Sequence, residues 1–67
     1  MRLKVNDTKE FNLTLDLNID YEAEQIDIIV RLWNKKTHNT DAWGFDGNHL
    51  NLALAKYNEL EKTYFGS

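Results

Sequence analysis

Apolar and polar residues alternate without a break along two neighbouring segments of the chain. The apolar positions are Phe11, Leu13, Leu15, Leu17 and Ile19 in the first segment, and Ile26, Ile28, Val30 and Leu32 in the second. A period of two is typical of a strand with one buried face. If Ile19 pairs with Ile26, every apolar residue of the second segment meets one of the first, whereas a slip of one residue would disrupt all these pairs. The pattern predicts an antiparallel hairpin of residues 11–19 and 26–33 with a four-residue loop at 21–24.

A further strand is predicted at residues 2–5, before this hairpin. Val5 opposite Phe11 and Leu3 opposite Leu13 would add its apolar side chains to the same face. The connection that follows contains asparagine and aspartate, which bond to their own backbone and tolerate turn conformations. The three segments therefore form a predicted meander with one apolar face.

The spacing of apolar residues changes to a helical period near the C-terminus. One stripe on a helical wheel collects Leu50, Ala53, Leu54, Tyr57, Leu60, Tyr64 and Phe65. Asp46 is a suitable N-cap, because its carboxylate can accept a hydrogen bond from a free first-turn N–H. Gly66 follows the last apolar residue, where a left-handed C-terminal cap favours glycine. We therefore predict a helix over residues 47–65 that covers the apolar face of the sheet.

One charged residue falls inside the apolar stripe of this helix. Glu61 lies between Leu50 and Leu54 on the helical wheel. Because burial of an unpaired charge is costly, we expect its carboxylate to reach water at the end of the stripe and to pair with Arg2 or Lys4. A polar contact inside an oligomer interface is the alternative.

Together these elements predict one α+β domain over residues 1–67. Its architecture is a three-stranded antiparallel β-meander followed by one helix (β-β-β-α), which packs on one face of the sheet. Residues 34–45, between the last strand and the helix, are predicted as a loop. In a second interpretation, residues 42–45 add a short extended piece, and the sequence alone does not choose between the two.

The composition limits the classes of protein to consider. The chain of 67 residues has no cysteine, which excludes disulfides and thiolate metal sites and fits a reducing compartment. No apolar run is long enough to span a membrane, and the first residues lack the apolar segment of a signal peptide, so we expect a cytoplasmic protein. A core this small is marginal, so we expect a homodimer. Residues with A/T-rich codons outnumber those with G/C-rich codons. An AT-rich gene of this kind is associated with low-GC bacteria and their phages.

Little in the sequence indicates catalysis or metal binding. The only serine is Ser67, at the last position, so no preorganised serine triad is expected. A zinc site would have to be assembled from His38, Asp41, Asp46 and His49. These residues match no ligand motif, and the glycines lack the spacing of a phosphate-binding loop. We therefore predict a non-enzymatic protein with no catalytic residue, metal site or cofactor.

The sheet face opposite the helix carries large side chains as well as polar ones. Ile29, Arg31 and Trp33 point away from the helix in the predicted register. We expect Trp43 nearby, because the segment after the last strand returns toward the sheet. Trp and Arg are enriched at the centres of protein interfaces, so these four residues form the predicted partner-binding site. In the alternative interpretation, the loop folds over Ile29 and Trp33 and buries them as a second cluster.

The charges separate into two poles. Five acidic residues surround the hairpin tip: Asp16, Asp20, Glu22, Glu24 and Asp27. The opposite end carries Lys35, Lys36 and His38. With Trp33 and Trp43, this basic group has the ingredients of a weak single-strand nucleic-acid site. The acidic group could instead act as a phosphate mimic that blocks a nucleic-acid-binding partner. A net charge of −3 and a pI of about 5.2 disfavour direct nucleic-acid binding.

The sequence thus favours a small, non-enzymatic protein-binding or regulatory accessory protein of a phage or mobile element. It would act by occupying a surface of a macromolecule, with an unidentified protein as its partner. A nucleic-acid-directed protein is the alternative, and we expect no membrane partner.

Overall fold

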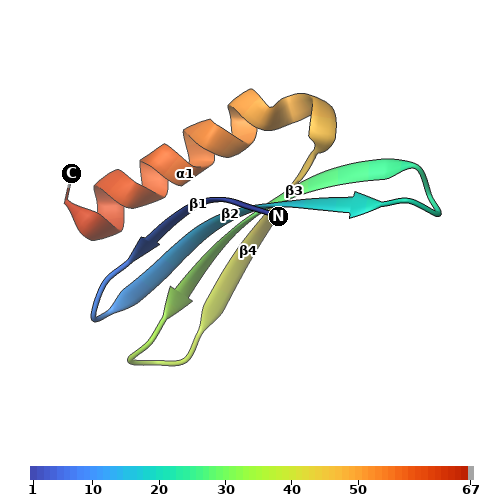
Figure 1. The fold of residues 1–67 in the computed structure, drawn as a ribbon. Coiled ribbons are helices and arrows are strands. Elements are labelled where there is room, and N and C mark those ends of the chain that lie inside the picture. Colours follow the sequence, from blue (N-terminus) through green and yellow to red (C-terminus); the bar gives the residue numbers. More distant parts are fainter. Residues whose placement is uncertain (67) are drawn as a thin grey trace.

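The computed structural model, which describes residues 1–66, contains one antiparallel sheet followed by a helix (Figure 1). The elements are β1 (Arg2–Asp7), β2 (Phe11–Asp20), β3 (Gln25–Asn34), β4 (Thr40–Asp46), the 3-10 turn η1 (Gly47–His49) and helix α1 (Leu50–Phe65). The strands lie in the order β1-β2-β3-β4, and each is antiparallel to the next. The α+β class and the meander with a C-terminal helix agree with the prediction, but the sheet has four strands rather than three.

The β2–β3 hairpin has the predicted register over its whole length. Ile19 pairs with Ile26 and Leu15 pairs with Val30, and a four-residue turn at residues 21–24 joins the strands. The carboxylate of Asp20 accepts hydrogen bonds from the two backbone N–H groups of Glu22 and Ala23, at 3.1 and 3.2 Å. This side-chain bonding to the backbone stabilises a turn that contains no glycine.

The predicted register of β1 is wrong. Val5 pairs with Thr14 rather than Phe11, and the register shifts between Arg2 and Lys4, which leaves Leu3 in an irregular position. Val5 therefore points away from the helix and is 54% exposed. The apolar residues of this short strand do not join the core, because it lies at the sheet edge, where a solvated face costs little.

Polar side chains of β1 reach the helix instead. Asn6 donates a hydrogen bond to the Glu61 carboxylate at 3.0 Å, and the Lys4 ammonium lies 4.9 Å from the centre of the Tyr57 ring. The expected ion pair of Glu61 with Arg2 or Lys4 is therefore replaced by a bond to an amide. A carboxylate inside an apolar helix stripe is compatible with the fold because this neutral donor meets it at the edge of the core.

Most of the predicted loop at residues 34–45 is a strand, which agrees with the second interpretation of residues 42–45 as an extended piece. β4 pairs with β3 from Asp27–Asp46 to Trp33–Thr40, and only residues 35–39 connect the two. Trp43 and Phe45 pack against the core from this strand. The sequence of β4 contains a glycine and two aspartates, residue types that are rare in strands. The alternation of apolar residues in β4 is therefore limited to Trp43 and Phe45.

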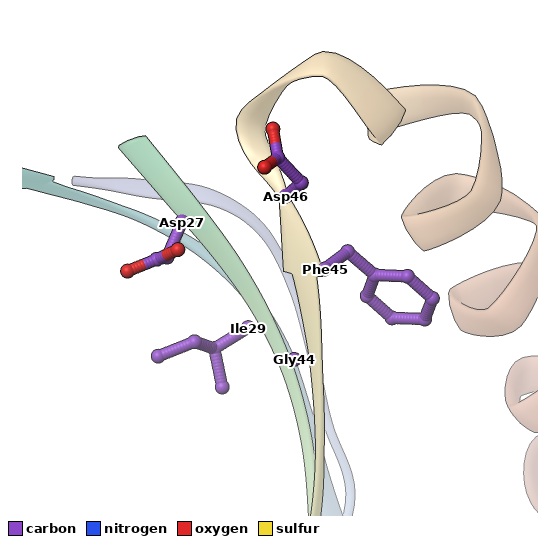
Figure 2. Close-up of a pocket in the computed structure, with 5 residues that line it drawn as sticks. All are labelled: Asp27, Ile29, Gly44, Phe45 and Asp46. Atoms are coloured by element: carbon purple, nitrogen blue, oxygen red, sulfur yellow. The ribbon is translucent and has the colours of Figure 1, made fainter. Parts of the chain in front are cut away.

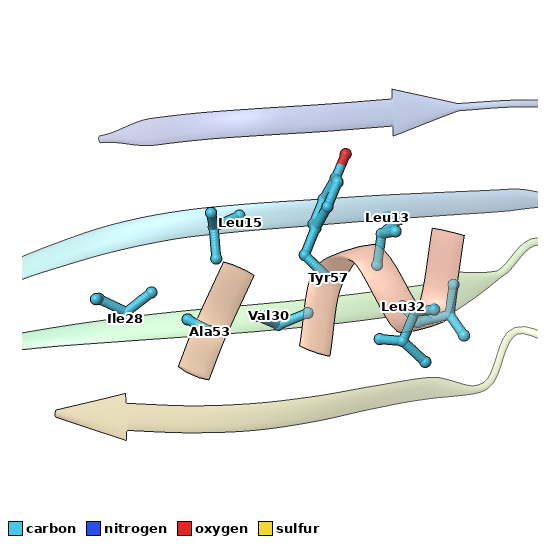
Figure 3. Close-up of a cluster of buried hydrophobic side chains, with 8 residues drawn as sticks. Leu13, Leu15, Ile28, Val30, Leu32, Ala53 and Tyr57 are labelled. Carbon is cyan, nitrogen blue, oxygen red and sulfur yellow. The ribbon is translucent and has the colours of Figure 1, made fainter. Parts of the chain in front are cut away.

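The core lies between β2, β3 and the helix. Its buried side chains are Leu13, Leu15, Ile28, Val30, Leu32, Ala53, Tyr57 and Leu60. Figure 3 shows the Tyr57 ring directed toward the sheet between Leu13 and Leu15. Phe11 extends this contact at the far end of the helix, with ring centres 5.1 Å from Tyr64 and 6.2 Å from Phe65.

Both helix boundaries follow the predicted signals. Asp46 accepts a hydrogen bond from the Asn48 backbone at 3.0 Å, although it caps the 3-10 turn and the α-helix begins at Leu50. Gly66 has a φ of 70°, the left-handed conformation expected for a glycine cap. Gly47 is required for another reason, because a Cβ atom there would lie 2.7 Å from the Ile26 carbonyl oxygen.

The tip of the β2–β3 hairpin extends past the helix (Figure 1). Ile19 and Ile26 pair there on the helix-facing side, yet they are 43% and 47% exposed. The predicted apolar face is therefore sealed only in its middle, over Leu13, Leu15 and their partners.

Candidate protein-binding face

The sheet has an outer face, which we define as the strand side chains that point away from α1. No element of residues 1–66 covers it (Figure 1). Cross-strand pairing sets its rows: Val5, Thr14, Arg31 and Ala42 form one, and Asp7, Asn12, Trp33 and Thr40 form the next. Another row contains Asp16, Ile29 and Gly44. A sheet with one covered face leaves the other in contact with solvent, so this face is available to a partner.

Three of the four predicted partner-binding residues lie on this outer face. Trp33 is 40% exposed, Ile29 is half-buried and Arg31 is exposed. The segment after β3 does not fold over them. It turns within residues 35–39 and returns as β4 beside β3, so the interpretation in which a loop covers Ile29 and Trp33 is wrong.

Trp43 does not belong to this group. It pairs with Val30, so its side chain lies on the helix-facing side and packs against the core. The Lys56 ammonium from α1 lies 4.8 Å from the centre of its ring. The expectation that Trp43 lies beside Trp33 fails because strand residues of opposite parity point to opposite faces. The second interpretation, an extended piece at residues 42–45, contains the available signal, because Trp43 and Phe45 then share one parity.

Arg31 is held on the outer face by Asp16. The Asp16 carboxylate lies 3.1 Å from the Arg2 side chain and 3.5 Å from that of Arg31, and its own side chain is only 17% exposed. Exposed ion pairs of this kind contribute little to stability. Their main effect here is to draw the Arg31 guanidinium toward Asp16, the cross-strand partner of Ile29.

The ammonium group of Lys35 has partners within the domain. It lies 2.7 Å from the Asp7 carboxylate and donates to the Thr8 carbonyl oxygen at 2.7 Å. The hydrogen bonds from Lys35 and Asn12 hold the pKa of Asp7 below its ordinary value. The contribution of Asp7 to folding is therefore present above pH 3.8 and is lost as the pH falls through the lowered pKa.

The residues predicted for nucleic-acid contact are not brought to one surface. Lys35 lies 6.0 Å from the Trp33 ring on one face, whereas Trp43 is on the other. Lys36 and His38 are exposed in the turn between β3 and β4, and His38 has a φ of 63°. Of the two tryptophans, only Trp33 therefore lies on the same face as Lys35.

The acidic residues have different local roles. Asp16 pairs with two arginines, and Asp20 accepts bonds from the turn backbone. Glu22 and Glu24 are exposed at the hairpin tip. Asp27 lies on the outer face and pairs across the strands with Asp46 of β4, whose carboxylate turns toward the backbone N–H of Asn48 (Figure 2).

A shallow depression lies beside this acidic pair. It has a volume of about 440 Å³ and is lined by Asp27, Ile29, Gly44, Phe45 and Asp46. Figure 2 shows Asp27 and Ile29 projecting from β3 on the outer side, whereas the Phe45 ring points to the helix. A Cβ atom at Gly44 would have no heavy atom within 4 Å. The missing side chain of Gly44 therefore leaves open space next to Ile29.

Metal-ligand groups do not gather in the structure. Within residues 1–66, no group of three or more His, Cys, Asp and Glu side chains could hold a metal ion. His38 and His49 lie at opposite ends of β4. Ser67 is outside the described residues. No helix in the described part of the chain is long and apolar enough to cross a membrane.

No family model, curated protein or solved structure matches this chain.

Proposed function

We propose that this domain is a non-enzymatic protein-binding module that uses the outer face of its sheet. The observation that carries the proposal is the 40% exposed Trp33 on an uncovered sheet face, in the same strand as Ile29 and Arg31. A tryptophan with an arginine that is already fixed in place has the chemistry of an interface centre.

The separation of core and outer face supports this proposal. All eight buried apolar residues belong to the helix-facing side of the sheet or to the helix itself. The apolar side chains of the outer face, among them Val5 and Trp33, are not needed to seal that core. Large apolar side chains that remain on a solvated sheet face gain free energy when a partner removes them from water.

Substitution of Trp33 by alanine tests the proposal. Wild type, Trp33→Ala and Tyr21→Ala are used as bait in a lysate of the native host. Tyr21 is a suitable control, because it is 84% exposed but lies at the hairpin tip. We expect wild type and Tyr21→Ala to recover the same protein from the lysate. Calorimetry with that protein should show that Trp33→Ala binds it about tenfold more weakly than wild type does. Equal recovery by all three proteins contradicts the proposal.

The expected homodimer remains part of this proposal. Because the core is small, association through the outer face would bury additional apolar surface. Sedimentation equilibrium of wild type and Trp33→Ala measures it. A wild-type dimer that the substitution converts to a monomer supports the homodimer, whereas a wild-type monomer at all concentrations contradicts it.

A further inference from the structure

The two edges of the sheet differ in how open they are to another strand. β1 has a shift in register between Arg2 and Lys4, and Lys4 points toward the helix. Bulges and inward-pointing lysines are features that protect natural edge strands from pairing. β4 has neither, since its seven residues pair with β3 in one continuous register and include no proline, lysine or arginine.

The free edge of β4 has unused hydrogen-bonding groups. In an antiparallel pair, alternate residues direct their N–H and C=O groups away from the neighbouring strand. Within residues 1–66, no backbone hydrogen bond joins β4 to an element other than β3. A segment in extended conformation could therefore be added to this edge as a further strand.

The depression at Gly44 lies where a side chain of such a strand would pass. Open space at Gly44 continues onto the half-buried Ile29, which supplies an apolar surface. The cross-strand neighbours Asp27 and Asp46 line one end of the depression. One oxygen of Asp46 accepts the Asn48 N–H, and none of the ion pairs within residues 1–66 involves either carboxylate. A long aliphatic side chain with a cationic end complements this arrangement in shape and charge.

The charge of β4 argues against a second copy as the occupant of this edge. Antiparallel pairing of two β4 strands would bring Asp41 and Asp46 of both copies into one ribbon that contains no basic residue. Like charges in neighbouring strands are destabilising. A basic strand from a different protein avoids this repulsion.

We infer that β4 binds an extended basic segment of a partner protein as a fifth strand, with a lysine or arginine side chain lying over Gly44 along Ile29 and its cationic end at Asp27 and Asp46. This inference rests on the proposed protein-binding function and names the chemistry of the partner. On the helix-facing side, the alternate positions of the segment lie beside the partly buried Trp43 and Phe45, so they are apolar.

A peptide of seven residues with alternating lysine and valine, matched in length to β4, is the probe. It is titrated into the isotopically labelled full chain and followed by amide NMR. We expect the shifts to concentrate at residues 40–46, and Gly44→Val to weaken binding about tenfold, because the new side chain fills the depression. We expect this variant to fold, because a Cβ atom at Gly44 has no heavy atom within 4 Å. No shifts at β4, or equal binding by Gly44→Val, overturns the inference.

Charge and backbone controls separate strand pairing from general attraction to an acidic protein. Asp27→Asn is compared with Glu24→Gln, which removes the same charge at the hairpin tip, and only Asp27→Asn is expected to weaken binding. Two further peptides are N-methylated at every second residue, each at the positions that the other leaves free. The peptide whose methyl groups face β4 cannot form the backbone hydrogen bonds and should not bind, whereas the peptide whose methyl groups face solvent should bind like the unmethylated one. Equal binding by both methylated peptides, or equal loss from both charge variants, overturns the inference.

The partner recovered with the full chain distinguishes this inference from the proposed function. A partner that Trp33→Ala loses but that Gly44→Val and Asp27→Asn retain overturns the β4 inference and leaves the outer-face proposal standing. If only the β4 variants fail to bind the partner, the proposed role of Trp33 is contradicted and binding at the β4 edge is supported.

Discussion

Tyr57 shows how one side chain connects both layers of the domain. It is the largest of the fully buried side chains, and its ring lies between the helix and β2 (Figure 3). Lys4 approaches the ring from β1, and Glu61 lies one helical turn further along. Burial, and secondarily the Glu61 charge, raise the pKa of the Tyr57 hydroxyl.

The raised pKa of Tyr57 predicts a loss of stability at alkaline pH. Well below pH 10 the hydroxyl is protonated in both the folded and the unfolded state, so its contribution to stability is complete. As the pH rises further, the unfolded chain ionises first, and the free energy of unfolding falls. Chemical denaturation of wild type and Tyr57→Phe between pH 8 and about 11.5 measures this effect. The decline should be smaller in the variant, and an identical decline in both proteins contradicts the assignment.

Strain at Glu24 gives a second prediction for a single residue. Glu24 has a φ of 53°, a conformation that glycine adopts without a steric penalty. Glu24→Gly should raise the free energy of unfolding by about 0.5–1 kcal/mol. Glu22→Gly is the control, since Glu22 in the same turn is not among the residues with positive φ, and it should lower stability through the entropy of the unfolded chain. The same sign for both variants, measured by urea denaturation, counts against the turn geometry.

At the level of elements, the sequence predicts what long patterns specify. The β2–β3 register follows from nine alternating apolar positions, because any slip would expose all of them. β1 offers only Leu3 and Val5, which is too few to choose between faces once Lys4 and Asn6 find partners on the helix. The outer-face residues of β3 follow from the hairpin register. The face of Trp43 depends on the parity of β4, and the sequence leaves residues 42–45 open between a loop and an extended piece.

The close approach of η1 to β3 makes a prediction for the two glycines near it. Gly47→Ala should lower the free energy of unfolding by about 1–3 kcal/mol, because the added Cβ meets the backbone of Ile26 at 2.7 Å. Gly44→Ala is the matched control and should cause no such loss, since its Cβ meets open space. Thermal denaturation compares the two, and equal stability of both variants would show that η1 does not press against β3.

The whole molecule is a two-layer structure with one exposed sheet face. It measures 37 × 22 × 15 Å, and the thin dimension follows from a single helix on a single sheet. This arrangement places the buried apolar core on the helix side. On the outer face Thr14 is buried between its neighbours, but no element of residues 1–66 covers Trp33 or the free edge of β4. The proposed binding surfaces therefore coincide with the parts of the sheet that the fold itself does not use.

The unfolding free energy of Trp33→Ala tests most directly the claim that the outer face is separate from the core. Leu15→Ala is measured beside it as the core reference and should lose about 2–5 kcal/mol, because Leu15 is fully buried. We predict that Trp33→Ala loses less than about 1 kcal/mol and keeps the wild-type circular dichroism spectrum. A loss equal to that of Leu15→Ala would show that Trp33 supports the fold, and it would contradict the account.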